Sequence, residues 1–332
     1  MSTKPVIPVI LLCALPASGK SESRAFLKSL DPRDLRENFC IGENVQLDDY
    51  PYVHMMRQFD LALEKLHQPR IFYKSDLECF RDGFEWGTLI ELLNEDYQDL
   101  VTRKMTPLEH PTQWLMTRID RARCILHLRP YFVGMTDEVK AGLAHELDEE
   151  CAGVIREKNA GIPDTLEGKT VVIEFARGGP EGSNYPIAQP QGYQYSLSLL
   201  SRDILSNAAM LYIWVTPEES RRKNQARAKP NGDGSILFHG VPEKVMRDDY
   251  GCDDIDYLLR ISDRPNTLKV EVAPFHTYYV PVGRFDNRHD LTTFARGDPK
   301  TWPQEAVTSI RGAMTAAFTG LLAQFHELHG KH

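Results

Sequence analysis

The residues with the clearest capacity for chemistry lie near the start of the chain, where a short loop ends in Gly19-Lys20-Ser21. An apolar run precedes the loop and a helix-forming segment follows it, which is the setting of the phosphate-binding pattern G-x-x-x-x-G-K-[ST]. There, backbone N–H groups and the helix N-terminus bind phosphate, the lysine reaches the terminal phosphates, and the hydroxyl binds Mg²⁺. We therefore expect a nucleotide at Ala14, Leu15, Pro16, Ala17, Ser18, Gly19, Lys20 and Ser21, with Lys20 catalytic and Ser21 at the metal.

One position departs from this pattern, because Ala14 stands where the first glycine is usual. Alanine is acceptable there if its φ stays negative, although it restricts the backbone. The alternative interpretation is a Gly-Lys-Ser turn that begins a helix and binds no phosphate.

Two adjacent carboxylates, Asp48 and Asp49, follow a second short predicted strand at about 44–47. Parallel sheets gather their functional loops at the carboxyl edge, so this pair is expected beside the phosphate loop. Neighbouring residues of an extended segment point in different directions. We assign Asp48 as the general base that accepts the proton of an acceptor hydroxyl, and Asp49 as a metal ligand. The alternative for Asp49 is a cap on the helix that follows.

A third acid, Glu174, lies near the end of the apolar strand predicted at 169–175. An acid in such a strand is unfavourable unless it is paired or faces a metal, so we expect Glu174 to bind Mg²⁺. The alternative is a salt bridge to Arg177 or another cation. The loop after this strand is polar and aromatic, and we expect Arg177 and Tyr193 to contact the acceptor substrate.

Cations for a transferring phosphoryl group are offered by a predicted helix that begins at Thr216-Pro217 and precedes a Gly-rich loop at 230–234. We expect this segment to act as a lid that brings Arg222 and Arg227 onto the phosphates. The alternative is a solvated helix face whose arginines pair with neighbouring glutamates.

A last candidate pair, Asp286-Asn287, ends the final predicted strand. That edge position suits contact with the nucleotide base or its neighbouring loop. A simple turn is the alternative interpretation.

The elements that must position these residues indicate an α/β protein with a three-layer, mostly parallel five-stranded sheet. We assign residues 1–67 and 169–332 to this core and residues 68–168 to a helical insertion, because that stretch repeats apolar residues at helical spacing. No internal repeat is apparent. The chain has 332 residues, 42% of them hydrophobic, which is ample for a buried core.

The overall composition of the chain limits the binding partners and the cellular compartment that we expect for the protein. The formal net charge of −8 argues against a surface that coats nucleic acid. Six cysteines without a C-x-x-C pair are typical of reduced thiols in a cytoplasmic protein, and no His/Cys spacing indicates zinc. The apolar run at 6–14 leads directly into the loop, so we interpret it as a strand, and no run is long enough for a membrane span.

Three stretches resemble P-loop kinases of the nucleoside and nucleotide kinase group. Residues 14–21 resemble the family's Gly-x-Pro-Gly-Ser-Gly-Lys-Ser/Thr loop, with Ala14 and Ala17 replacing glycines. Leu47-Asp48-Asp49-Tyr50 resembles the Asp-Asp-aromatic sequence of polynucleotide 5′-kinases and nicotinamide riboside kinases, and residues 213–227 resemble the strand and lid helix of the same group. The resemblance implies the P-loop fold, ATP and Mg²⁺ as cofactors, and Asp48 as general base.

Together these observations predict an ATP-dependent kinase that phosphorylates a hydroxyl of a small nucleoside-like or sugar-like acceptor. Two alternatives stay open. The first is a nucleotide-binding regulatory or interaction protein that has no acceptor substrate. The second is a 5′-hydroxyl polynucleotide kinase, which the negative net charge of the chain disfavours.

Overall fold

The computed structural model describes residues 5–227, 240–272 and 275–330, and its centre is a sheet in the strand order β2-β3-β1-β4-β6-β5. Five strands run parallel, and β5 is antiparallel to β6 at one edge. The α/β class and the mostly parallel sheet are as predicted. The strands are β1 (Val9–Cys13), β2 (Glu43–Asp48), β3 (Lys169–Phe175), β4 (Ala208–Trp214), β5 (Thr267–Val272) and β6 (His276–Asp286).

The predicted count of five strands is wrong, because β5 was missed. Its sequence, Thr-Leu-Lys-Val-Glu-Val, alternates in polarity as a half-covered strand does. It pairs with the first half of β6, from Thr267 opposite Pro281 to Val272 opposite His276. The parallel part of the sheet, which carries the predicted site residues, is unaffected by this edge.

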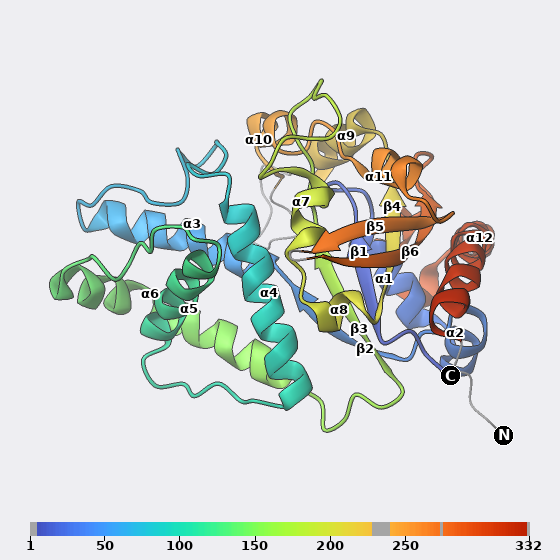
Figure 1. Ribbon diagram of the computed structural model, residues 1–332, viewed down its shortest axis with the longest axis horizontal. Helices are drawn as coiled ribbons and strands as arrows, with labels where there is room; N and C mark the ends of the chain where they lie inside the picture. Colours follow the sequence, from blue (N-terminus) through green and yellow to red (C-terminus); the bar gives the residue numbers. More distant parts are fainter. Residues whose placement is uncertain (1–4, 228–239, 273–274, 331–332) are drawn as a thin grey trace.

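Helices cover both faces of the sheet (Figure 1). On one face α1 (Lys20–Ser29), α2 (Pro32–Phe39) and α12 (Gln304–His329) bury a core that includes Phe26, Phe39 and Phe318. The opposite face is covered by α4 (Glu85–Thr102), α7 (Gly192–Ser198), α8 (Arg202–Leu205) and α11 (Ile255–Ile261). Because both faces are covered, the inner strands β1 and β3 are almost continuously apolar.

The C-terminal helix α12 is, within the described residues, the one helix long and apolar enough to cross a membrane by length and composition. Buried core helices of soluble proteins can have the same length and apolar composition. Ile310, Met314, Phe318 and Leu321 of α12 are buried in the sheet core, which accounts for its apolar character.

A helical lobe extends to one side of the sheet (Figure 1). It contains α4, α5 (Pro111–Ile125) and α6 (Asp137–Ala160), which lie in the predicted insertion, and also α3 (Tyr50–Lys65), which the sequence analysis assigned to the core. These helices share one hydrophobic cluster, in which the Phe59 and Phe132 rings lie 4.9 Å apart. The ion pair between Lys65 and Glu146 joins α3 to α6 at 2.6 Å.

The lobe contains an internal repeat that the sequence analysis did not recognise. Asp60 of α3 accepts backbone N–H bonds from residues 11, 12 and 13 positions later, and Asp120 of α5 does the same. His67 and His127, just after these helices, have φ of 56° and 59°. Identical residues recur 60 positions apart at Pro51/Pro111, Met56/Met116, Asp60/Asp120, Ala62/Ala122, Leu66/Leu126, His67/His127 and Phe72/Phe132.

Two further helices, α9 (Pro217–Arg227) and α10 (Glu243–Asp248), lie at the top of Figure 1. The predicted lid loop at 230–234 lies outside the described residues, as does the side chain of Arg227.

Candidate functional site

The loop at 14–19 joins the end of β1 to the start of α1, which is the strand–loop–helix order that its sequence predicts. Helix α1 begins at Lys20, directly after Gly19, whose φ is 98°. A side chain at Gly19 would also collide with the loop after β6, since a Cβ there would lie 2.4 Å from Thr292 Oγ1. Ala14 is not among the residues with positive φ, so alanine fits that position, whereas Ala17 holds a left-handed φ of 57°.

Carbonyl groups of this loop are fixed by side chains from several elements. Tyr193 of α7 donates to the Ala14 carbonyl at 3.1 Å, and Ser220 of α9 donates to the Pro16 carbonyl at 2.7 Å. Asn287, after β6, donates to the Ser18 carbonyl at 2.7 Å, and the Ser18 hydroxyl donates to the Leu15 carbonyl. The loop is therefore rigidly held before any ligand arrives.

A small hollow of about 90 Å³ is lined by the loop and by one acid from β3. Within the described residues the backbone N–H groups of Gly19 and Lys20 donate no hydrogen bond. Free N–H groups at the start of a helix bind anions. The hollow brings together Ala17, Ser18, Gly19, Lys20, Ser21 and Glu174, so five of the eight predicted phosphate residues share one space with a predicted metal ligand.

The strand register places Asp48 directly beside Glu174. The two side chains lie on the sheet face that α1 covers, because Val45 and Leu47 of β2 and Ile173 and Phe175 of β3 face the opposite core. Arg24, one helical turn after Lys20, contacts Glu174 at 3.0 Å. Two carboxylates and two cations therefore meet at the end of β2 and β3.

Burial, and to a smaller extent neighbouring negative charge, raises the pKa of Asp48. Burial raises the pKa of Asp48 to about 7, with smaller contributions in the same direction from Glu174 and Asp49. The backbone N–H of Tyr50, 2.8 Å from Asp48 Oδ1, and the charge of Lys20 oppose this rise. A carboxyl group with a pKa near neutrality can both accept and release a proton, as a general base must.

The neighbouring acid, Asp49, is in a different environment. Asp49 Oδ2 accepts a 2.7 Å bond from Arg177, whose side chain is almost fully buried. The same guanidinium donates to Ser196 at 3.0 Å and lies 4.8 Å from the Trp86 ring. This ion pair joins the start of α3 to the loop after β3, so Asp49 is a structural anion in this geometry and not a free metal ligand.

The predicted acceptor contacts of Arg177 and Tyr193 are likewise not supported by their positions. Both side chains are buried, with 1% and 0% of their surface exposed. Their polar atoms already bind Asp49, Ser196 and the Ala14 carbonyl. Each residue therefore supports the site from the protein core, and neither has a polar side-chain atom left to contact a substrate.

The other predicted residues have different outcomes. Arg222 is exposed and forms a paired contact with Glu219, with both bonds at 2.7 Å, so it lies on a solvated helix face. Asp286 pairs with Arg288 at 2.7 Å at the surface, whereas Asn287 is fully buried and holds the loop between β1 and α1. Asn287 is thus a positioning residue and not a contact to a base.

Several residues that complete the site were missed in the sequence. Arg24 pairs with Glu174, and its position four residues after Lys20 on one helix face could have revealed it. Lys223 of α9 lies 3.0 Å from Asp290, in the loop after β6, and no local pattern predicts that contact. Ser220 follows the Thr-Pro-Glu-Glu helix start but has no distinguishing motif.

The oxygen atoms that line the hollow suit a divalent cation. Ser21 and Glu174 supply oxygen atoms in the same hollow, and Mg²⁺ usually takes only one or two protein carboxylates together with substrate phosphates and water. Among the described residues no group of three or more His, Cys, Asp or Glu side chains could hold a metal alone. The residues therefore fit a metal that arrives with a nucleotide.

Comparison with known proteins places this geometry in no family: no family model, curated protein or solved structure matches the chain.

Proposed function

We propose that the protein is an ATP- and Mg²⁺-dependent kinase with a P-loop NTPase fold, which transfers the γ-phosphoryl group to a hydroxyl of a small acceptor. The observation that carries this proposal is the position of Asp48, whose pKa is raised to about 7, beside the Glu174 that lines the hollow of the Gly19-Lys20-Ser21 loop. A phosphate cradle next to a proton acceptor is what transfer to an alcohol requires.

In this proposal each residue has one task. The loop amides and Lys20 hold the β- and γ-phosphates, and Asp48 accepts the proton of the acceptor hydroxyl as it attacks. Ser21 and Glu174 would hold Mg²⁺, which neutralises phosphate charge when it is bound. Arg24 keeps Glu174 in place and balances its charge.

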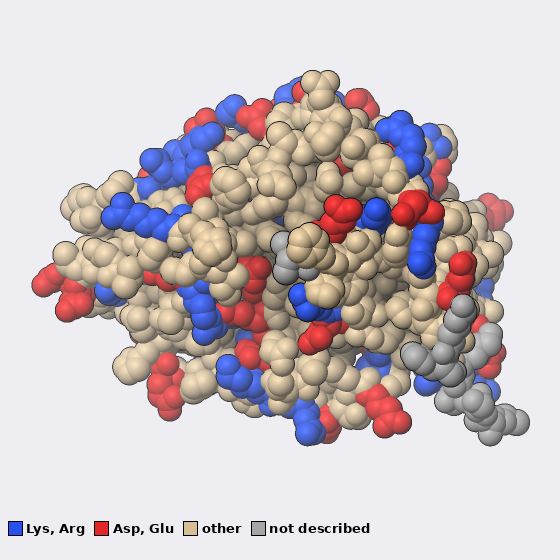
Figure 2. All heavy atoms as spheres, in the orientation of Figure 1, with Lys and Arg blue, Asp and Glu red and all other residues tan. Residues whose placement is uncertain are grey.

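A small acceptor is favoured over a polynucleotide by the surface charge. The net charge is −8, and the face shown in Figure 2 intersperses acidic and basic side chains without a broad basic region. Binding along a nucleic-acid backbone would require such a region. The chemistry also favours a cytoplasmic enzyme, because ATP and reduced cysteines belong to that compartment.

The test is an acceptor screen read by ADP formation. Purified protein with ATP and Mg²⁺ is offered nucleosides, sugars, vitamins and 5′-hydroxyl oligonucleotides, with the Lys20→Ala variant run in parallel as the background. We expect one small-molecule class to stimulate ADP release, and we expect Lys20→Ala to abolish the stimulated rate.

Other outcomes are equally decisive. Bound nucleotide with no stimulated ADP release across the whole panel favours the regulatory alternative. Stimulation by oligonucleotides alone, with steep salt dependence, replaces the small acceptor by nucleic acid. Failure of the wild-type protein to bind ATP removes the proposal altogether.

A further inference from the structure

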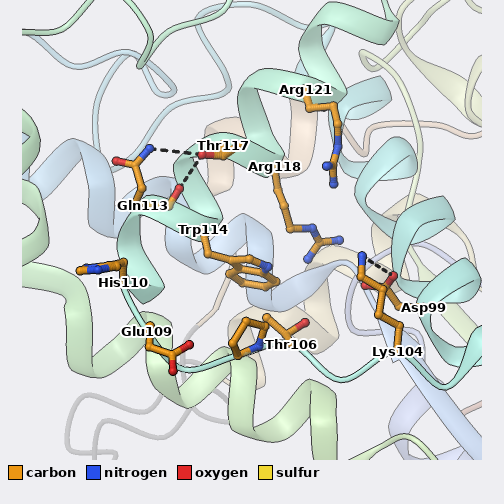
Figure 3. Close-up of a pocket in the computed structure, with 11 residues that line it drawn as sticks. Asp99, Lys104, Thr106, Glu109, His110, Gln113, Trp114, Thr117, Arg118 and Arg121 are labelled. Carbon is orange, nitrogen blue, oxygen red and sulfur yellow. Dashed lines mark hydrogen bonds and ion pairs between the residues drawn. The ribbon is translucent and has the colours of Figure 1, made fainter.

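A second and larger pocket, of about 370 Å³, lies in the helical lobe and does not include the phosphate loop. Figure 3 shows Trp114 of α5 at its centre, with side chains from the same helix and from the end of α4 around it. Its volume falls at the lower end of the range for pockets that hold small molecules, about 300–1,000 Å³. The pocket is therefore large enough for a compact ligand.

The floor of this pocket is rigid and amphipathic. The Arg118 guanidinium lies 4.8 Å from the Trp114 ring, and its own charge is matched by Glu95 at 2.7 Å and Asp96 at 2.9 Å. Arg118 also donates to the Leu92 carbonyl, which leaves it no freedom to move. A fixed indole face beside the pocket suits a flat ring.

Cations at the rim are less constrained. The side chains of Arg121 and Lys104 are 55% and 69% exposed, and among the residues that the structure describes each pairs with one acid, Glu95 and Asp99 respectively. Figure 3 shows both cationic groups on the same side of the indole as Arg118, with Gln113 and Thr117 on the other side. An anionic group on a ring that stacks on Trp114 would be within reach of two exposed cations.

The position of the pocket in the repeat gives an independent reason to regard it as a site. It is lined by the start of α5, and in the first copy the corresponding start of α3 is where Asp48 and Asp49 lie. Arg118 donates to the Tyr52 hydroxyl at 2.8 Å, and Tyr52 is in the first turn of α3. The pocket thus contacts, through one fixed residue, the helix that begins at the candidate catalytic edge.

We propose that this pocket binds a small planar aromatic molecule that carries a carboxylate or a phosphate. The ring lies on Trp114, and the anionic group is bound by Arg121 and Lys104. The proposal does not depend on the kinase function, because it concerns binding alone.

The test uses the indole N–H signals of the tryptophans in NMR spectra of the full chain. The probes are 4-hydroxybenzoate, phenyl phosphate and inorganic phosphate, and the Trp114→Phe variant identifies the Trp114 signal. We expect a saturable shift of this signal with at least one ring-bearing probe, and not with inorganic phosphate. The other tryptophan signals, from Trp86, Trp214 and Trp302, should not follow the same curve.

Matched variants then test the cations. Combined Arg121→Gln and Lys104→Gln substitutions should weaken probe binding about five-fold or more. Arg156→Gln, an exposed arginine of α6 that does not line the pocket, should leave it unchanged. Unchanged thermal unfolding would show that the variants are folded. The proposal is overturned if neither ring-bearing probe shifts the Trp114 signal, or if the double variant binds as the wild type does.

Discussion

Acids in two regions of this molecule have different surroundings. In the helical lobe Glu85 contacts Arg123, Asp96 contacts Arg118 and Asp99 contacts Lys158, while the fully buried Asp60 is held by three backbone N–H groups. At the carboxyl edge of the sheet, Asp48 has no ion-pair partner within the described residues and lies beside a second acid, Glu174. Removing one partner of a buried ion pair destabilises a fold, whereas crowded like charges with perturbed pKa values are typical of functional sites.

The largest effect that would test this contrast is expected in the lobe. Arg123→Ala leaves the fully buried Glu85 without its cation, so we expect a loss of about 3–5 kcal/mol in the free energy of unfolding, measured by urea denaturation. Arg156→Ala, which removes an exposed partner of Glu149, is the control and should change little. Equal effects of the two substitutions would mean that the buried pair is not structural.

The opposite result is expected at the sheet edge. Asp48→Asn keeps an oxygen for the 2.8 Å bond from the Tyr50 N–H but cannot accept a proton. We expect acceptor phosphorylation to fall by about a hundredfold or more, while ATP affinity is retained. Turnover at the wild-type rate in this variant would remove the general-base assignment.

The pH dependence of stability sharpens the same comparison. The pKa of Asp48 is raised from 3.8 to about 7, so the folded protein holds a proton that the unfolded chain releases between these values. Stability contributed by this group is full below about pH 4 and is lost as the pH rises to about 7. Asp48→Asn should therefore be more stable than the wild type by about 1–3 kcal/mol at pH 8 and similar to it at pH 4, as measured by thermal unfolding.

The smallest effect is expected at Arg222, on the exposed face of α9. Its hydrogen bonds within the described part of the chain are with Glu219 alone, so Arg222→Gln should leave the unfolding midpoint unchanged. If the arginine also reaches the phosphates during turnover, kcat will fall without any change in stability. Loss of stability in this variant would contradict the surface pairing.

Local sequence was sufficient for the central features of the site. The apolar run, the loop and the polar helix start predicted β1, residues 14–21 and α1, and the β-branched run at 169–175 predicted β3 over the observed range. These features follow from short-range periodicity and turn chemistry. The carboxyl edge was predicted for Asp48, but the strand order that makes Glu174 its direct neighbour was not.

Long-range pairing was not predictable in the same way. The partner of Asp49 is Arg177, 128 residues later, and the residue that holds the Ser18 carbonyl is Asn287, 269 residues later. Nothing local distinguishes such side chains from substrate ligands of the same type. The repeat in the lobe was missed because its matched residues are few and scattered, and only the shared backbone bonds to Asp60 and Asp120 make it evident.

The side chains that hold the loop between β1 and α1 have a thermodynamic consequence. Tyr193, Ser220 and Asn287 immobilise the carbonyls of residues 14, 16 and 18 in the free protein. The conformational entropy of that backbone is therefore already lost when the protein folds. Binding of an anion to the loop costs little further backbone entropy. Association should proceed without a slow rearrangement of the loop, and weakening any one of the three tethers should slow anion capture before it alters the chemistry.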